Sequence, residues 1–589
     1  MNIVGTLKNI TAKSIVEIYG LQLNANEIQI NETKSEFDGN YTIVLFSLVK
    51  QLKKSPEVLG AEIGEHLCAN NKSIASAFNV IKGFLNITIA DELLLEYLKS
   101  PSVGETEKKS KSKVMIEYSS PNTNKPLHLG HLRNIFLGWS VAAIRKENGN
   151  DIVKTCIVND RGIHICKSMI AWKMFANGAT PTSTNTKGDH FVGEYYVKFN
   201  DVLKQQIEEL IAQGKSKDEA EKQAPIMLET QQMLLDWEQG KPAVIALWKE
   251  MNSWVYNGFD ITYKKIGADF DKVYYESNTY LLGKEIVQKG LEKKVFYKKD
   301  DGSVWIDLTA DGLDEKLVMR KDGTSVYITQ DIGLAEQKYN EYQCDKSIYV
   351  IGDEQNYHMK VLKLICQKLE LPSANEIEHL SYGMVELTTG KMKSREGTVV
   401  DADDIVNDMI NIAKQRTVEL GKVADFTEDE LEHLYSIIGL GALKFFLLRV
   451  DPKKRMIFNP EESIDFHGFT GPFIQYTHAR IKSVLRKVGA VDETLNLSNT
   501  LLPLEKQLLM LTEQFNTVLL EAMQESDPSK IAIYVFNLAK TFNTFYAEHS
   551  IANAENEEKK LLRIAISTLT AKVIKKSMQV LGIEVPERM

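Results

Sequence analysis

The stretch "SSPNTNKPLHLGHLRN", residues 119–134, decides the fold of the central part of this chain. It overlaps the end of "VMIEYSS" (114–120), a mostly apolar, β-rich run that is typical of a buried parallel strand. The following "LGHLRNIFLGWSVAAIRKENGN" (129–150) has helical periodicity and ends in Gly-Asn, a helix stop. The next strand is "DIVKTCIVND" (151–160). This βαβ unit predicts an α/β fold with a doubly wound parallel sheet.

The loop between strand and helix is unusual because a phosphate-binding loop at this place is generally rich in glycine. Here Gly130 stands between His128 and His131. The first turn of a helix offers unpaired N–H groups and partial positive charge to an anion. Gly130 leaves room for a base and ribose, and both histidines can donate toward phosphate oxygens. The pattern predicts a site for ATP with its α-phosphate open to attack; a helix cap with two incidental histidines is the alternative.

A second motif, "GKMKSREGTVV" (390–400), follows the later strands of the predicted sheet. It brings Lys391, Lys393 and Arg395 together. Their positive charge would hold the β- and γ-phosphates of ATP while pyrophosphate leaves. Taken alone, such a segment is most often a solvated basic loop.

Length and composition indicate a soluble protein with more than one domain. A chain of 589 residues is too long for one core, and 43% hydrophobic with 26% charged residues is typical of a soluble protein. We expect no membrane span and no signal peptide. A net charge of -9 does not exclude nucleic-acid binding, because local patches set the field. The cysteines form no C-x-x-C pair, so we expect no zinc site or disulfide framework, and a reducing cytoplasm fits; they are Cys68, Cys156, Cys166, Cys344 and Cys366.

The pattern along the chain predicts several domains. Residues 1–105 alternate amphipathic helices with short strands and end in a linker rich in lysine. Residues 110–400 contain the parallel sheet, interrupted at about 180–260 by a long charged helical insertion. Residues 401–460 and 461–589 have an almost wholly helical pattern. Asp322-Gly323, between two β-rich runs, predicts a hairpin whose second arm includes "VYITQDIG".

The two motifs resemble the HIGH and KMSKS signatures of class I aminoacyl-tRNA synthetases. The rest of the sequence resembles the arginyl-tRNA synthetase family from about residue 110 to the last residue, and more weakly before residue 110. The resemblance implies a Rossmann-type catalytic domain that joins L-arginine to tRNA(Arg) with ATP and Mg²⁺, no dedicated metal site and a monomer in the cytoplasm. The segments that carry it are "IEYSSPNTNKPLHLGHLRN", "VYITQDIG", "GMVELTTGKMKSREGTVV", "TGPFIQYTHARIKSVLRK" and "LGIEVPERM".

One departure from the family pattern concerns a lysine. The family pattern K-M-S-K-S would place a lysine at position 394, where this chain has Ser394. Family members that lack that lysine carry one before the histidines, and Lys125 stands at that place. Lys125 is therefore the expected substitute charge, with Lys393 as a rival that the sequence leaves open.

The resemblance also implies roles for residues of the sites. For ATP it points to His128, Gly130, His131, Met384, Val385, Lys391, Met392 and Ser394, with catalysis by the two histidines, Lys125, Lys391, Lys393 and Arg395. For arginine it points to Glu117, Ser120, Asn122, Glu276, Tyr327, Asp331, Gln355 and His358, with Glu117 supporting the loop from behind. For tRNA it points to Tyr476, Arg480, Phe545, Tyr546 and Met589, in a bundle that binds the anticodon; the aromatic ones are core residues in the alternative interpretation.

Arginine as the substrate has a chemical rationale. A planar guanidinium with five donors is best met by carboxylates in fork geometry, which Glu276 and Asp331 would supply. Tyr327 and Asp331 are four residues apart, so a helix would place both toward the pocket. The alternatives are a helix N-cap for Asp331 and a surface acid for Glu276.

Two other functions remain open from the sequence. A small nucleotidyltransferase uses the same H-x-G-H chemistry, but such enzymes are shorter and lack an all-helical third. A catalytically inactive tRNA-binding paralogue would conserve the helical domains, although intact histidines and the basic motif argue against it. ATP–pyrophosphate exchange with arginine and tRNA separates the three functions.

Overall fold

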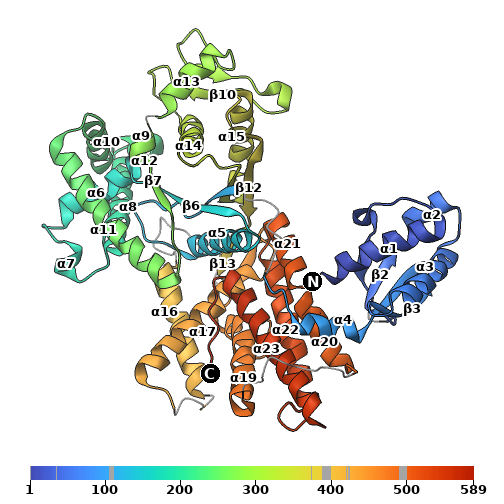
Figure 1. Cartoon of the computed structure of the whole chain (residues 1–589). Helices are drawn as coiled ribbons and strands as arrows, with labels where there is room; N and C mark the ends of the chain where they lie inside the picture. Colours follow the sequence, from blue (N-terminus) through green and yellow to red (C-terminus); the bar gives the residue numbers. More distant parts are fainter. Residues whose placement is uncertain are drawn as a thin grey trace.

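The predicted parallel strands form a five-stranded sheet at the centre of the molecule (Figure 1). In this computed structural model the strand order is β12 (Ile377–Tyr382), β11 (Lys346–Gly352), β5 (Lys113–Glu117), β6 (Asp151–Val158) and β7 (Lys272–Tyr275). Each neighbouring pair is parallel. The chain builds outward from β5 in both directions, which confirms the doubly wound, Rossmann-type prediction. Ligands of such sheets bind at the β5–β11 switch point, beyond the carboxyl ends of the strands.

The structure describes most of the chain, with gaps that matter for the second motif. Predictions for Lys391, Met392, Lys393, Ser394 and Arg395 lie outside the described residues. The described residues are 2–34, 36–104, 112–280, 282–324, 326–372, 374–387, 400–419, 421, 425–489 and 500–589.

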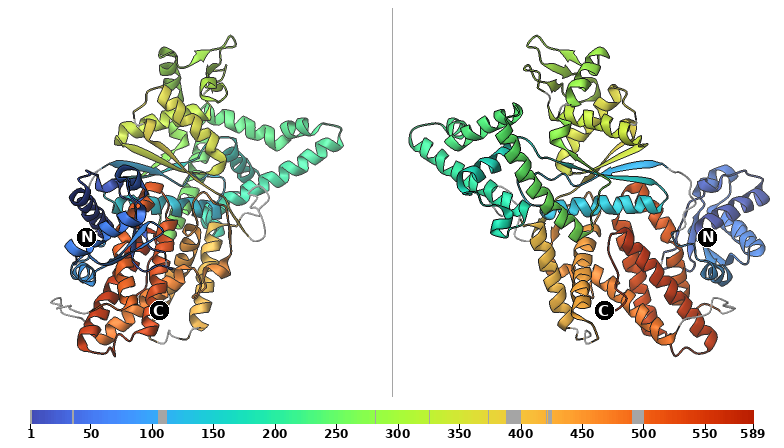
Figure 2. Two further views of the ribbon diagram at one scale, coloured as in Figure 1. Left: turned by 90° about the vertical axis from the view of Figure 1, so that its right-hand side faces the viewer. Right: turned by 60° about the vertical axis from the view of Figure 1, so that its left-hand side comes forward.

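Helices cover both faces of the sheet because each face presents apolar side chains. Ile348 of β11 belongs to a core shared with α5 (Leu129–Glu147), whereas its neighbour Tyr349 belongs to a second core. That second core includes α14 (Tyr327–Tyr342) and α15 (Asn356–Lys368). Successive side chains of a strand point to opposite faces, so each face needs its own apolar cover. Figure 2 shows α5 and the α14–α15 pair on opposite sides of the sheet.

The predicted insertion at about 180–260 is helical, and it projects to one side of the sheet (Figure 2). Ser216 and Glu219 form a reciprocal capping box at the start of one of its helices. Gly267, in the left-handed conformation at φ 72°, ends the last one. The helices are α6 (Ile163–Phe175), which precedes the insertion, α7 (Pro181–Thr184), α8 (Gly188–Ala212), α9 (Lys217–Gln223), α10 (Pro225–Glu238) and α11 (Pro242–Ile266).

The region after β7 contains a small antiparallel sheet and two further helices. Its strands pair in the order β10 (Lys316–Met319), β9 (Val304–Ile306) and β8 (Tyr297–Lys298). The helices are α12 (Glu276–Thr279) and α13 (Leu282–Glu292).

The predicted second arm of the Asp322-Gly323 hairpin is wrong. Gly323 does turn the chain, at φ 80°, but the helix α14 begins at Tyr327, inside the supposed strand. The β-branched residues there favour a strand only by local propensity. Ile328 and Ile332 lie about one helical turn apart in α14, and both pack into the second core.

The last third of the chain is almost wholly helical, as predicted. One short strand, β14 (Met456–Phe458), pairs in parallel with β13 (Val385–Leu387). The helices are α16 (Ala402–Glu419), α17 (Glu428–Leu448), α18 (Pro460–Ser463), α19 (Gly471–Val488), α20 (Pro503–Glu513), α21 (Phe515–Glu525), α22 (Ser529–Glu548) and α23 (Glu557–Val580).

One helix departs from the expectation about membrane spans. Within the described ranges, α17 is long and apolar enough by composition to cross a bilayer. However, 67% of its most apolar 18-residue window is buried inside the protein. Such burial is typical of a core helix.

The first hundred residues form the predicted small α+β unit, which lies beside the C-terminal helices (Figure 1). Its antiparallel sheet has the order β1 (Ile30–Glu32), β2 (Tyr41–Val44), β4 (Phe84–Ile89) and β3 (Ala75–Ile81). Its helices are α1 (Ile3–Tyr19), α2 (Phe46–Leu52), α3 (Pro56–Asn70) and α4 (Asp91–Lys99).

A buried carboxyl group joins this N-terminal unit to the C-terminal helices. The backbone N–H of Ile3, at the start of α1, donates to Oε1 of Glu513 at 2.7 Å. Glu513 is 5% exposed, and burial raises the pKa of its carboxyl group to about 7, although the Ile3 N–H acts in the opposite direction. The folded state therefore holds a proton on Glu513 that the unfolded chain releases near pH 4.5.

We predict that the carboxyl group of Glu513 makes the free energy of unfolding fall as the pH rises. Between about pH 4.5 and 7 the folded state binds more protons, so the contribution of Glu513 is complete below pH 4.5 and is lost by about pH 7. The slope is at most about 1.4 kcal/mol per pH unit. Glu513→Gln, which is always neutral, should lose less stability than the unaltered chain in urea unfolding between pH 5 and 8. Glu548→Gln, at an exposed position, is the control; parallel curves for all three proteins would contradict the prediction.

Candidate active site

Loops after four parallel strands bring three predicted site residues and Asp160 to one edge of the sheet. His128 follows β5, Asp160 follows β6, Glu276 follows β7 and Gln355 follows β11. The carboxyl ends of parallel strands lie at the same edge. Topology alone therefore gathers residues that are more than 200 positions apart in sequence.

The loop after β5 is held at both ends by backbone hydrogen bonds. Ser119 adopts φ 61°, and its N–H donates to Oδ1 of Asn134 at 2.6 Å. The Asn134 amide in turn donates to the carbonyl oxygen of Val350 at 2.7 Å, so α5 is tied across the switch point. Farther along, the N–H of Thr123 donates to the carbonyl oxygen of Asn159 at 3.1 Å. The predicted amino-group ligands lie in this loop: Ser120 is exposed and Asn122 partly exposed.

The two histidines form the start of α5 itself. Nδ1 of His128 accepts the N–H of Gly130 at 3.1 Å, and Nδ1 of His131 accepts the N–H of His128, also at 3.1 Å. Their ring centroids are 3.9 Å apart. The motif is therefore a helix cap, as the alternative interpretation proposed, but the cap also fixes both rings side by side in the site.

These caps determine which ring nitrogen carries the proton. Burial, and then the charge of Lys125, lower the pKa of His128 to about 4, and burial followed by His128 and Lys125 lowers that of His131. Both imidazoles are neutral at neutral pH. Because each Nδ1 accepts a backbone N–H, each Nε2 carries the hydrogen. The pair thus offers two Nε2–H donors to an anion without adding net charge.

The chain after the basic motif returns to the histidines. Asp401 forms an antiparallel bridge with His128, and the N–H of Ala402 donates to the carbonyl oxygen of Leu127 at 2.9 Å. Asp401 and Ala402, which follow the basic motif, therefore lie beside the H-x-G-H turn. No local pattern in the sequence predicts this contact, because it joins residues more than 270 positions apart.

The predicted arginine pocket is acidic. Asp331 lies in the first turns of α14, with Oδ2 at 2.7 Å from Nε2 of His358 on α15. Glu276 begins α12, where burial raises the pKa of its carboxyl group to about 7; Arg161 opposes that rise, while Asp160 and Asp331 add to it. The charge of Asp331 thus contributes to the raised pKa of Glu276, and a shared pocket for a cation stays a prediction.

Sequence reasoning missed Asp160, which holds the start of α12. Its Oδ1 accepts the N–H of Ser277 at 2.8 Å, and its Oδ2 accepts the hydroxyls of Ser277 at 2.7 Å and Tyr256 at 2.9 Å. Ser277 follows Glu276 directly, so Asp160 fixes the backbone that presents Glu276. Its position at the carboxyl end of β6, in "VND", was the signal that could have identified it.

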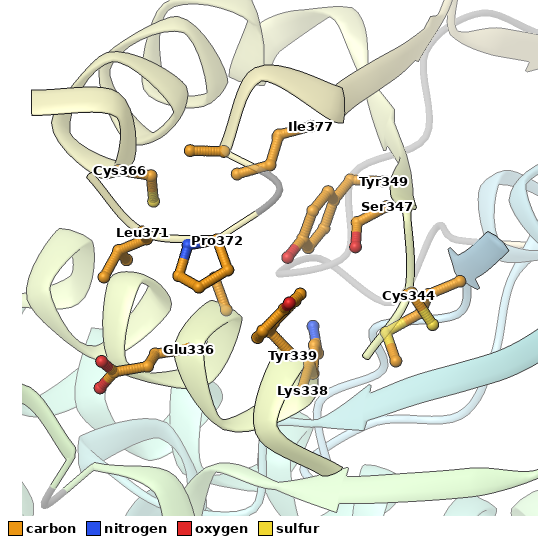
Figure 3. Close-up of a pocket in the computed structure, with 13 residues that line it drawn as sticks. Glu336, Lys338, Tyr339, Cys344, Ser347, Tyr349, Cys366, Leu371, Pro372 and Ile377 are labelled. Carbon is orange, nitrogen blue, oxygen red and sulfur yellow. The ribbon is translucent and has the colours of Figure 1, made fainter. Parts of the chain in front are cut away.

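The structure places Glu117 behind the loop. It is buried at the end of β5, where its carboxylate forms an ion pair with Lys338 of α14. Lys338 also lines a cavity of about 20 Å³ with Tyr349 and Cys366 (Figure 3). That volume is close to that of one water and is too small for a substrate. Glu117 therefore pairs with an ammonium group of the protein itself, and its role in supporting the loop stays a prediction.

Other predicted residues differ in accessibility. Tyr327 is 74% exposed at the start of α14, and Gln355 is exposed beyond β11. Met384 is 37% exposed, whereas Val385 of β13 is buried, so an ATP contact by Val385 would use its backbone.

The predicted RNA-binding residues line a groove of about 950 Å³ at the C-terminal helices. The guanidinium of Arg480 lies 4.8 Å from the ring centroid of Tyr476 and 5.5 Å from that of Tyr546. Met589 also lines this groove. Phe545 does not: it is fully buried in α22, so the prediction of an RNA contact is wrong and the core alternative is correct.

Comparison with known families covers nearly the whole chain. Residues 94–459 match the family described as "tRNA synthetases class I (R), catalytic domain". Residues 474–589 match "DALR anticodon binding domain", and residues 5–89 match "Arginyl tRNA synthetase N terminal domain".

Curated relatives are similar over their full length. The chain is 53% identical to the arginine–tRNA ligase of Bacteroides fragilis over 598 residues, which cover 100% of both proteins. It is 52% identical to that of Parabacteroides distasonis over 98% of both, and 52% identical to that of Flavobacterium psychrophilum over 96% of this chain and 97% of the relative.

Solved structures share the fold. The arginyl-tRNA synthetase of Thermus thermophilus superimposes with a TM-score of 0.79 at 22% identity over 99% of both chains. That of Plasmodium falciparum gives 0.77 at 16% identity over 100% of this chain and 99% of that one. With the family match and the identity of the curated relatives, the conclusion is direct: the chain belongs to the arginine–tRNA ligase family of class I tRNA synthetases.

Proposed function

We propose that this chain attaches arginine to tRNA(Arg) in two steps at the carboxyl edge of its parallel sheet. The arginine carboxylate attacks the α-phosphate of ATP; a C–O–P bond forms, the α–β phosphoanhydride bond breaks, and pyrophosphate leaves. A ribose hydroxyl of the terminal adenosine of tRNA then attacks the arginyl carbonyl, and AMP leaves. The full-length identity of 53% to a curated arginine–tRNA ligase supports this function.

The part of the site proposed for ATP contains hydrogen-bond donors whose positions are fixed before ATP binds. We propose that the Nε2–H groups of His128 and His131 hydrogen-bond phosphate oxygens, while Gly130 leaves space for the nucleoside. The depressed pKa values of both imidazoles support this role, because neutral rings donate without competing for a proton. Donors that point to developing charge are worth about 10²–10³ in rate each.

Positive charge on the phosphates would come from Lys125 and the basic motif. Lys125 lies near enough to lower the pKa of both histidines, which supports its role as the substitute for the missing lysine at 394. We assign Lys391, Lys393 and Arg395 to the β- and γ-phosphates. Mg²⁺ would arrive with ATP, held by its phosphates.

The arginine side would use the acidic cluster. We assign the guanidinium to Glu276 and Asp331 and the flank of the side chain to Tyr327. Ser120 and Asn122 would bind the α-amino group, and Gln355 with His358 would line the far wall. Because two carboxylates would be left unpaired by lysine or citrulline, these substrates would be rejected by about 10⁴-fold without editing.

We propose four regions for the complex with tRNA. Residues 1–105 would contact the tRNA elbow, 110–400 would carry out catalysis, 401–460 would contact the stem and 461–589 would bind the anticodon. The groove around Arg480 supports the last assignment, since a guanidinium between two aromatic rings suits unstacked bases. We further propose a monomer that acts in the cytoplasm.

Aminoacylation of total tRNA with each amino acid tests the function. Arginine should be attached, and lysine and citrulline should react about 10⁴-fold less efficiently. Attachment of a different amino acid would refute the proposal. A protein that binds tRNA(Arg) but attaches nothing would be the inactive paralogue.

The histidine cap allows catalysis to be separated from folding. His131→Ala and His131→Gln should both lower the rate of tRNA-dependent ATP–pyrophosphate exchange by about 10²–10³-fold, because both lose the Nε2–H donor. Glutamine at this third helical position retains an acceptor for the N–H of His128, so His131→Gln should also retain the melting temperature. Binding of tRNA should be unchanged in both. Near-normal exchange by His131→Gln would remove the assigned role.

Glu276 should make arginine binding depend on pH. Only the carboxylate pairs with a guanidinium, and its pKa is about 7, so KM for arginine should fall as the pH rises from 6 to 8. Glu276→Gln should raise KM about 10²-fold at pH 8 and abolish this pH dependence. Glu292→Gln, exposed on α13, is the control. The assignment fails if Glu276→Gln keeps the same pH profile as the unaltered enzyme.

A further inference from the structure

The helical insertion carries a charged cluster that reaches the catalytic histidines. Three of its members stand at the start of α8, one on α11 and two at the start of α16. They are Lys187, Asp189, His190, Thr262, Asp401 and Asp403.

Lys187 is the centre of this cluster. Its Nζ donates to Oδ2 of Asp403 at 2.6 Å, to Oγ1 of Thr262 at 2.6 Å and to Oδ2 of Asp189 at 3.0 Å. The side chain of Lys187 is 18% exposed and that of Asp403 is 15% exposed. Asp189, His190 and Asp403 would suit a metal ion by spacing, but the ammonium of Lys187 already bonds one carboxylate oxygen of Asp189 and one of Asp403. The cluster is thus an ion pair shielded from water, and loss of either partner leaves a charge unpaired.

His190 adds a second cation from the same helix. Its Nε2 lies 3.1 Å from Oδ2 of Asp403 and 3.3 Å from Oδ2 of Asp401. Hydrogen bonds with these two carboxylates raise its pKa to about 10. Burial alone would raise the pKa of Asp403, but hydrogen bonds from His190 and Lys187 bring it below its usual range. His190 and Asp403 are therefore both charged at neutral pH.

The anionic half of the cluster is joined to the catalytic turn. Asp401 forms the antiparallel bridge with His128, and Asp403 is tied to Asp401 because its N–H donates to Oδ1 of Asp401 at 2.7 Å. On its other side, α8 touches the loop before the histidines: a Cβ on Gly193 would lie only 2.8 Å from Cδ of Pro126. The insertion thus contacts two segments next to His128: the loop at Pro126, and the chain at Asp401 and Asp403.

We propose that Lys187 and His190 are positioning residues for arginine activation, which hold Asp401 and Asp403 so that the chain following the basic motif stays paired with His128. This inference rests on the proposed role of that motif on the phosphates. It gives the insertion at 180–260 a part in the chemistry as well as in packing. Arginine recognition is independent of it, because Glu276 and Asp331 stand on other elements.

The test is tRNA-dependent ATP–pyrophosphate exchange by the full chain. Lys187→Met removes the ammonium and keeps an unbranched stem; we expect the exchange kcat to fall about 10- to 100-fold, the cost of a small misplacement. KM for arginine should stay within about twofold. Glu194→Gln, exposed one turn farther along α8, is the matched control and should behave as the unaltered enzyme.

A double-mutant cycle identifies the partner. If Lys187 acts through Asp403, then Lys187→Met with Asp403→Asn should be no slower than the worse single variant, whereas independent effects would multiply. Multiplication, a normal rate in Lys187→Met, or an equal loss of arginine affinity would each overturn the inference. Should Lys187→Met not fold, His190→Gln, at a more exposed position, takes its place in the same comparisons. Absence of arginine-dependent exchange in the unaltered enzyme would instead refute the proposed function.

Discussion

Each imidazole of the His128–His131 pair accepts a backbone N–H through Nδ1, and these two hydrogen bonds orient both rings at the carboxyl edge of the sheet. They exist only if α5 begins at Leu129, and the helix begins there because the exit of β5 is fixed. Asn134 secures that exit by bonding both Ser119 and Val350, one on each side of the switch point. The orientation of both imidazoles therefore depends on hydrogen bonds of Asn134, about one helical turn away.

Burial shifts the pKa values of the two halves of the site in opposite directions. Burial keeps the imidazoles neutral, so they can donate hydrogen bonds to an anion at neutral pH. Burial also raises the pKa of Glu276 toward 7, while Arg161 limits that rise. An incoming guanidinium would oppose the rise further and complete the charge balance. Desolvation thus has two effects: it keeps the imidazoles neutral, as the proposed donors to phosphate require, and it raises the pKa of the carboxyl group proposed to meet a cation.

Polar contacts join segments that are far apart in the sequence. The insertion contributes Lys187 and His190 to the residues that follow the basic motif. The N-terminal unit contacts the C-terminal helices through Glu513 and Ile3. Shielded polar contacts of this kind fix the relative placement of large helical parts more specifically than apolar packing alone.

The sequence by itself determined the parallel sheet, the helical insertion, the helical last third and the histidine motif, because apolar periodicity and cap residues are local signals. It also pointed to Glu276 and Asp331, through the family resemblance. It failed at 326–333, where β-branched residues form the first turns of α14 because Ile328 and Ile332 pack together in the second core. It also could not separate Phe545, which is buried, from Tyr546, which lines the groove. Only the tertiary structure placed Asp160 under Glu276 and Asp401 beside His128, because these contacts join strands and loops whose separation in sequence carries no local pattern.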